Sequence, residues 1–180
     1  MESKFFDWNL QFEDDEQSVL IEPDEETNFF ELYLRGADVD EEFFSGFKFG
    51  WNQKGVRSHT LANNFGWRIV STELRSAIEE STTDLTFWEI PGFDGFSVVV
   101  PLVNVSGCVN TDESVGRLRR LGDNRVEIDS IERLVVDSNF VPDCEAFTIT
   151  EDPVTIFVST KLKDVIANFV PGRYNSVDLH

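Results

Sequence analysis

Apolar residues recur along this chain mainly with a period of two, which is typical of half-buried β-strands. At the start, Phe6, Trp8, Leu10 and Phe12 would share one face of such a strand. Similar strand patterns follow at 18–22, 28–34, 47–51, 85–90, 96–105, 126–128, 131–136, 146–150, 154–158 and 173–179. Helical patterns are fewer and short, at 38–44, at 112–120 and after two serines discussed below. The pattern predicts an α+β fold, mostly β-strands with two or three short helices.

One stretch of the chain occurs twice, at 68–80 and again at 156–168. Both copies read Val-Ser-Thr-x-Leu, then a cation, then Ile four residues after the Leu. The serine is placed to accept a hydrogen bond from a free N–H of the first helical turn. The Leu and Ile then lie on one helix face. We therefore predict a structural role for six residues in two sets 88 positions apart: Ser71, Leu74 and Ile78, and Ser159, Leu162 and Ile166.

The repeat organises the chain into two predicted strand–helix–strand units, 68–90 and 156–179. No linker or low-complexity tract separates them, so we expect one domain over 1–180. An acidic, β-rich part, 1–64, precedes the part that contains the units, 65–180. The polar stretch 55–64 is expected to be a mobile loop, and Pro101 should mark a strand edge or a bulge because it cannot donate to a ladder.

Charge is the strongest compositional signal. The chain carries 34 acidic and 15 basic residues, a net charge of −19. Residues 1–45 hold fifteen acids and two bases, a balance of −13, and the remainder holds nineteen and thirteen, a balance of −6. Such a field repels nucleic acid and speeds encounter with a basic protein. The acidity is also consistent with a solvated surface suited to a saline habitat, so both interpretations stay open.

Three acidic runs are the candidate partner-binding residues. The aromatic pairs 5–6, 29–30 and 43–44 lie beside them, either covered on both faces or exposed to a partner. The candidate residues are Glu13, Asp14, Asp15, Glu16, Asp24, Glu25, Glu26, Asp38, Asp40, Glu41 and Glu42.

Catalytic and metal-binding patterns are weak, so we expect no enzyme, no metal and no cofactor. His59 and His180 are the only histidines; His59 reads as a surface-loop residue, and no nucleophile elbow accompanies it. The run 13–16 lacks the alternating oxygen ligands and glycine of a calcium loop. The arginines at 117, 119, 120 and 125 could grip an anion, but pairing with the protein's own acids is the favoured interpretation.

Several signals favour the cytosol. Cys108 and Cys144 lie in a chain that is large enough to fold without a disulfide, so we expect two reduced thiols. No window of about 18 apolar residues is present, which argues against a membrane span. The first residues lack the cationic and apolar regions of a signal peptide.

Five motifs, the first of which has two parts, occur in the same order as in the bacterial immunity family numbered eleven in polymorphic toxin systems and resemble it. The resemblance covers about 65–180, although Asn110 stands where that family often has Asp, and 171–174 departs from its terminal strand. The similar segments are Ile69–Arg75, Phe87–Pro91, Val100–Val109, Ile131–Asp137, Glu145–Ile149 and Ile156–Asp164. The resemblance implies a non-enzymatic antitoxin that blocks a cognate secreted toxin, and it supplies no catalytic residue.

The resulting hypothesis is a cytoplasmic immunity protein whose acidic, aromatic-rich surface binds a cognate toxin or other basic protein, such as a nuclease. Charge complementarity would speed encounter, and buried aromatics would set the lifetime of the complex. Two alternatives stay open. One is an enzyme with a carboxylate-lined cleft, and the other is a self-associating structural module that forms a homodimer.

Overall fold

The computed structural model describes residues 5–9, 16–25, 27, 41–121, 125–170, 174 and 176–179. Within them the fold is α+β, mostly strands with three short helices, as the sequence predicts. The helices are α2 (Glu41–Ser45), α3 (Thr72–Glu79) and α4 (Thr160–Ala167). The strands are β1 (Phe5–Asp7), β2 (Ser18–Pro23), β3 (Phe47–Gln53), β4 (Ala62–Asn63), β5 (Ile69–Ser71), β6 (Leu85–Glu89), β7 (Phe96–Pro101), β8 (Asn104–Val105), β9 (Val115–Leu121), β10 (Arg125–Arg133), β11 (Val135–Val136), β12 (Ala146–Ile149), β13 (Asp152–Ser159) and β14 (Ser176–Leu179).

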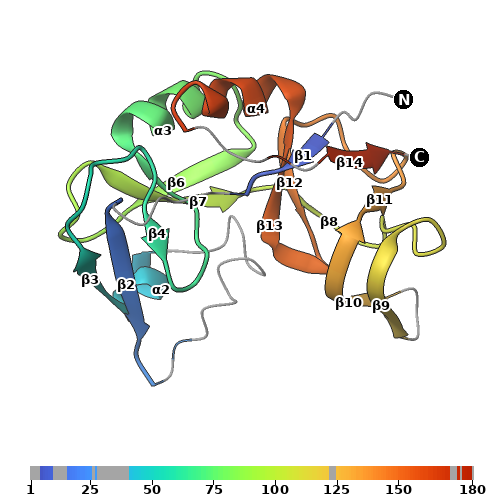
Figure 1. Ribbon diagram of the computed structural model, residues 1–180, viewed down its shortest axis with the longest axis horizontal. Helices are drawn as coiled ribbons and strands as arrows, with labels where there is room; N and C mark the ends of the chain where they lie inside the picture. The colour runs from blue at the N-terminus through green and yellow to red at the C-terminus, as the bar shows by residue number, and fades with distance from the viewer. Residues whose placement is uncertain are drawn as a thin grey trace.

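The described strands form three sheets and a hairpin. The largest sheet has the order β11-β14-β1-β13-β12-β8, and two three-stranded sheets have the orders β3-β2-β4 and β5-β7-β6. Strands β9 and β10 make an antiparallel hairpin. Helices α3 and α4 lie together along one side of the molecule, and the hairpin and the β2–β3 sheet extend from opposite ends of the other side (Figure 1).

The two helix starts confirm the predicted repeat. Ser71 and Ser159 have almost the same backbone angles, φ −69° and ψ 161° against φ −65° and ψ 166°. Each serine Oγ accepts a hydrogen bond from the N–H three residues on, Leu74 or Leu162, at 3.2 Å. The apolar positions of both helices, Leu74 and Ile78 in α3 and Leu162 and Ile166 in α4, are fully buried.

In each repeat unit a central strand lies between the two strands that flank the helix. The two central strands come from different parts of the chain. In the first unit the order β5-β7-β6 places β7 between the strands that flank α3. In the second unit the order β13-β1-β14 gives that place to β1. The backbone bonding agrees, since Val99 N–H donates to the carbonyl of Arg68 and Trp8 N–H to that of Ile156, both at 2.8 Å.

Three clusters of buried residues make the core. One lies under β2, β3 and α2 around Trp67, and another joins Phe5, Phe147 and Phe157 in the large sheet. The cluster between them contains Leu74 and Ile78 together with Leu162 and Ile166. Because both helices bury their apolar faces in this shared cluster, the two units form one core.

The first predicted loop, 55–64, is partly ordered structure. Thr60 and Leu61 are fully buried, and Ala62–Asn63 forms β4. Leu61 N–H donates to the carbonyl of Ile69 at 3.1 Å, and Ser71 N–H donates to that of His59 at 2.8 Å. The prediction of a loop is wrong for 60–63, because Thr60 bridges Val70 of β5 on the side away from β7 and β4 pairs with β2.

The predicted short helix at 112–120 is also wrong, because Val115–Leu121 is strand β9. Pairing with β10 overrides the local pattern, and Gly116 permits it. A Cβ atom on Gly116 would lie 2.3 Å from the carbonyl oxygen of Ser130. Pro101 is neither at an edge nor at a bulge: it is the last residue of β7, the central strand of its sheet, opposite Leu85.

Candidate functional site

The structure describes four side chains of the predicted acidic set: Glu16, Asp24, Glu25 and Glu42. Glu41 is the first residue of helix α2. Six predicted residues lie outside the described part of the chain: Glu13, Asp14, Asp15, Glu26, Asp38 and Asp40.

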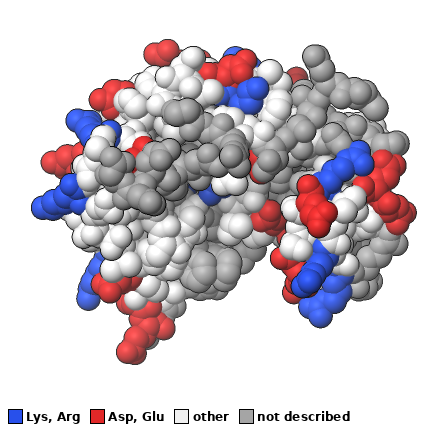
Figure 2. Space-filling view, in the orientation of Figure 1, with Lys and Arg blue, Asp and Glu red and all other residues white. Residues whose placement is uncertain are grey.

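Asp24 and Glu25 directly follow β2, and Glu42 lies in α2, the helix that ends beside the end of β2. The N–H of Asp24 donates to the carbonyl of Gly46 at 2.8 Å, which fixes the end of β2 against the end of the helix. Asp24, Glu25 and Glu42 are all exposed, and we call them the acidic corner. Acidic side chains gather at the lower left tip of the molecule, over this end of β2 (Figure 2). Glu16 precedes the opposite end of β2, so the structure separates it from the corner.

Most described aromatic rings near these acids are in the core. Phe43 and Phe44 both pack into the cluster around Trp67, with their rings 5.2 Å apart. Phe5 and Phe6 contact the two clusters on opposite faces of β1. The rings of these two aromatic pairs are therefore covered by the protein's own core. The exposed aromatic of β3 is Trp51, 37% accessible, with its ring 4.6 Å from that of Phe93.

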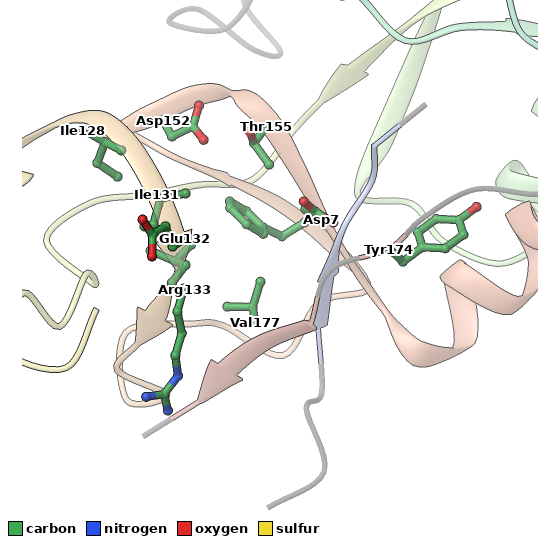
Figure 3. Close-up of a pocket in the computed structure, with 11 residues that line it drawn as sticks. Asp7, Ile128, Ile131, Glu132, Arg133, Asp152, Thr155, Tyr174 and Val177 are labelled. Atoms are coloured by element: carbon green, nitrogen blue, oxygen red, sulfur yellow. The ribbon is translucent and has the colours of Figure 1, made fainter. Parts of the chain in front are cut away.

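A groove of about 660 Å³ lies between the hairpin and the large sheet. Its apolar lining comes from β10, the residue after it and the sheet: Ile128, Ile131, Leu134, Phe157 and Val177. Its polar lining consists of Asp7, Glu132, Arg133, Asp152, Thr155 and Tyr174. Ile128, Ile131 and Glu132 project from β10 on one side, while Asp7 and Val177 project from β1 and β14 on the other (Figure 3). We call this cavity the β10 groove.

A β-bulge explains why an acid of β10 faces the groove. In the hairpin Ile131 pairs with Gly116 and Arg133 pairs with Val115, so Glu132 is the extra residue between them. A bulge bends the strand and re-aims a side chain. A second bulge leaves Asp129 as the extra residue between Ile128 and Ser130, and Asp129 does not line the groove.

The charges of the described groove lining are uneven. Asp7, Glu132 and Asp152 carry carboxylates, and Arg133 carries the one guanidinium among the described lining residues. The Arg133 guanidinium lies at the end of the groove opposite Asp152 (Figure 3). Burial raises the pKa of Tyr174 to about 12, so this phenol stays neutral at physiological pH. The acidic end of the groove is thus suited to a cation beside an apolar group.

His59 is not a free surface histidine, which corrects the sequence interpretation. It is half-buried, its ring lies 5.1 Å from that of Phe169, and its Nδ1 lies 2.9 Å from Ser71 Oγ. Ser71 is 1% exposed, and its hydroxyl already caps α3. This pair therefore holds a helix start in place, and a substrate cannot reach the serine.

The equivalent pair in the second unit is Glu145 and Ser159. Ser159 N–H donates to the Glu145 carbonyl at 2.8 Å, and the Ser159 hydroxyl is hydrogen-bonded to the Glu145 carboxylate. Lys161 Nζ lies 3.7 Å from the same carboxylate. His59 and Glu145 are thus the partners of equivalent caps, a relationship that sequence spacing does not reveal because they lie 86 positions apart rather than 88.

The remaining candidate chemistry is structural where it is described. Arg119 forms an ion pair with Glu127 across the hairpin, Arg117 is exposed, and the side chains of Arg120 and Arg125 lie outside the described set. Cys108 and Cys144 are not joined in a disulfide, and burial raises the pKa of Cys108 to about 12.

Within the described residues, no group of three or more His, Cys, Asp or Glu side chains is arranged to hold a metal ion. No described Asp or Glu is buried. In the described part of the chain no helix combines the length and apolarity needed to cross a bilayer.

Comparison with known proteins adds no assignment. No protein-family model matches the chain, and no curated protein sequence matches it significantly. The resemblance to the immunity family therefore stays a prediction.

Proposed function

We propose that this chain is a non-enzymatic binding protein that neutralises a basic protein partner in the bacterial cytoplasm, where it serves as the immunity partner of a secreted toxin. The observation that carries the proposal is the net charge of −19, of which −13 lies in the first 45 residues. The exposed acidic corner belongs to that segment. Its charges act on a basic partner over about 10 Å at 0.1 M salt, which raises the encounter rate.

The surface position of the carboxylates supports binding over catalysis. A carboxyl group used as a general acid needs an environment that disfavours its charge, usually burial beside apolar side chains. All described Asp and Glu residues are exposed or half-buried as whole residues, which is the placement that long-range attraction of a partner requires. The same charges disfavour phosphate backbones, so nucleic acid is not the proposed partner.

Capture from the source cell at two salt concentrations tests this proposal. The tagged protein should retain a basic protein at 50 mM salt and lose much of it at 500 mM, because exposed charge pairs are screened. Retention of no basic protein at 50 mM salt would contradict the proposal. Sedimentation at several concentrations, run in parallel, distinguishes partner binding from self-association.

Charge reversal at the corner gives the matched test. Glu25→Lys with Glu42→Lys changes the net charge by +4 and should slow association with the captured protein about tenfold or more at low salt. Glu80→Lys with Asp164→Lys changes the net charge equally, at exposed positions that end α3 and lie within α4, on the opposite side of the molecule. This control pair should slow association far less. Equal slowing by both pairs would show that no particular face is used.

A further inference from the structure

The β10 groove combines an apolar lining with acids at one end, and the acidic corner plays no part in it. Phe157 and Val177 come from the large sheet, and Ile128 and Ile131 come from the hairpin that faces it. Phe157 and Val177 are 2% exposed, whereas Ile128 and Ile131 are only partly buried. The apolar surface of the groove therefore comes chiefly from the hairpin side.

The size of the groove suits one large side chain and the backbone around it. Cavities of about 300–1,000 Å³ are typical of ligand sites, and the volume of about 660 Å³ lies in that range. An aromatic side chain buries about 150–250 Å² when it is enclosed. A cavity of this volume accepts one large side chain on the apolar lining together with the adjoining backbone.

Two acids of the groove determine which charge a bound ligand should carry. Glu132 is exposed and re-aimed by its bulge, and Asp152 is half-buried at the start of β13. They reach the groove from opposite sides, one from β10 and one from the large sheet. A carboxylate or phosphate on the occupant would be repelled by both, while a Lys or Arg beside the anchor would be attracted.

We propose that the β10 groove binds a short basic peptide segment of a protein partner, with one large apolar side chain on the groove lining and Lys or Arg residues beside Glu132 and Asp152. The inference rests on the proposed function for the identity of the partner as a basic protein, and it names the element of that partner that is held. The acidic corner speeds encounter, and the groove determines how long the complex lasts.

Defined peptides test the groove without the natural partner. The probes are acetyl-Lys-Phe-Lys-amide, its acidic counterpart with Glu in place of Lys, and a third peptide with Gly in place of Phe. Titration of the ¹⁵N-labelled full chain with the first peptide should shift the amides of 128–133, of Asp152 and of 154–157. The Gly peptide should bind at least about tenfold more weakly, because burial of the ring is lost. The acidic peptide should shift none of these amides.

Two neighbouring acids of β10 provide matched variants. Glu132→Gln removes a carboxylate that lines the groove and should weaken the basic peptide about threefold, as expected for an exposed charge pair. Asp129→Asn removes the other bulged acid and should leave binding unchanged. Equal binding of the basic and acidic peptides, equal effects of the two variants, or shifts confined to residues outside the groove would each overturn the proposal.

The peptide titration and the capture experiment can fail independently of each other. If the peptides do not bind but the protein still captures a basic partner in a salt-sensitive way, the groove proposal is contradicted and the proposal for the acidic corner stands. Peptide binding with no partner captured from the cell would support the groove and contradict the toxin assignment.

Discussion

Nδ1 of His59 lies 2.9 Å from Oγ of Ser71, and the N–H of the same serine donates to the His59 carbonyl at 2.8 Å. Glu145 holds Ser159 in the same two ways, through its carbonyl and its side chain. An imidazole and a carboxylate thus perform one task, orienting the hydroxyl that begins a helix. The bonding at each helix start predicts how the fold responds to loss of a cap.

Removal of either cap should destabilise the whole chain. Ser71→Ala and Ser159→Ala each leave a buried N–H without its acceptor, and each should lower the free energy of unfolding by about 1–2 kcal/mol. For a domain of this length that corresponds to a fall in Tm of about 2–8 °C, measurable by calorimetry. Ser76→Ala is the control, because Ser76 is exposed within α3 and its change should stay within about 0.5 kcal/mol. A neutral result at both caps would contradict this account of the repeat.

Glu73, in the first turn of α3, should make stability depend on pH. Its own backbone N–H, the Ser71 hydroxyl and the Arg57 cation favour the charged form and hold its pKa below the ordinary value of 4.5. A lowered carboxyl pKa contributes stability that is present above 4.5 and is lost as the pH falls through the native pKa. The difference in urea unfolding between the protein and Glu73→Gln should therefore be present at pH 7 and shrink as the pH falls below 4.5. A difference that grows on acidification would contradict the sign.

Gly116 in β9 should tolerate no side chain. A Cβ there would lie 2.3 Å from Ser130 O and 2.8 Å from Ile131 Cα, both of which are backbone atoms. Gly116→Ala should lower the free energy of unfolding by about 1–3 kcal/mol and loosen the hairpin that closes the groove. Gly50→Ala in β3 meets nothing within 4 Å and should be neutral or slightly stabilising. Hydrogen exchange of β9 and β10 amides would localise the effect.

The two thiols should react at very different rates. Burial raises the pKa of Cys108 to about 12, with Glu151 adding to the rise, so the thiolate needed for reaction is scarce at pH 8. Cys144 is half-buried. A disulfide reagent should modify Cys144 in the native protein and reach Cys108 only after denaturation, as mass spectrometry of the labelled peptides would record. Rapid labelling of Cys108 without unfolding would show that the large sheet opens.

Local features of the fold were predictable and long-range ones were not. The caps at Ser71 and Ser159 could be predicted because a cap needs only the residues of one helical turn. The place of β1 could not, because Phe5 pairs with Ser159 and Val177, far along the chain. The hairpin sequence Arg117-Leu118-Arg119 fits a helix start and a solvent-facing strand equally well. Pairing with β10 makes it a strand.

Of the two candidate binding surfaces, the sequence predicts one and not the other. Acidic runs are visible in any sequence, and the structure joins two of the segments that contain them through the bond between Asp24 and Gly46. No pattern in the sequence predicts the β10 groove, because the groove depends on bulges in β10 that bring Glu132 opposite Asp152. A bulge arises from how two strands register, and neither strand encodes that register alone.

The insertion of β1 between β13 and β14 affects how the protein is made. Phe5 in β1 pairs with Ser159 and Val177, each more than 150 residues further along the chain, so β1 cannot pair until those residues have been synthesised. The unit built around β7 has all its strands within 69–101 and can fold on the nascent chain. The large sheet therefore forms later than this unit, and until it does the apolar strand at Phe5 and Phe6 is a natural target for chaperones.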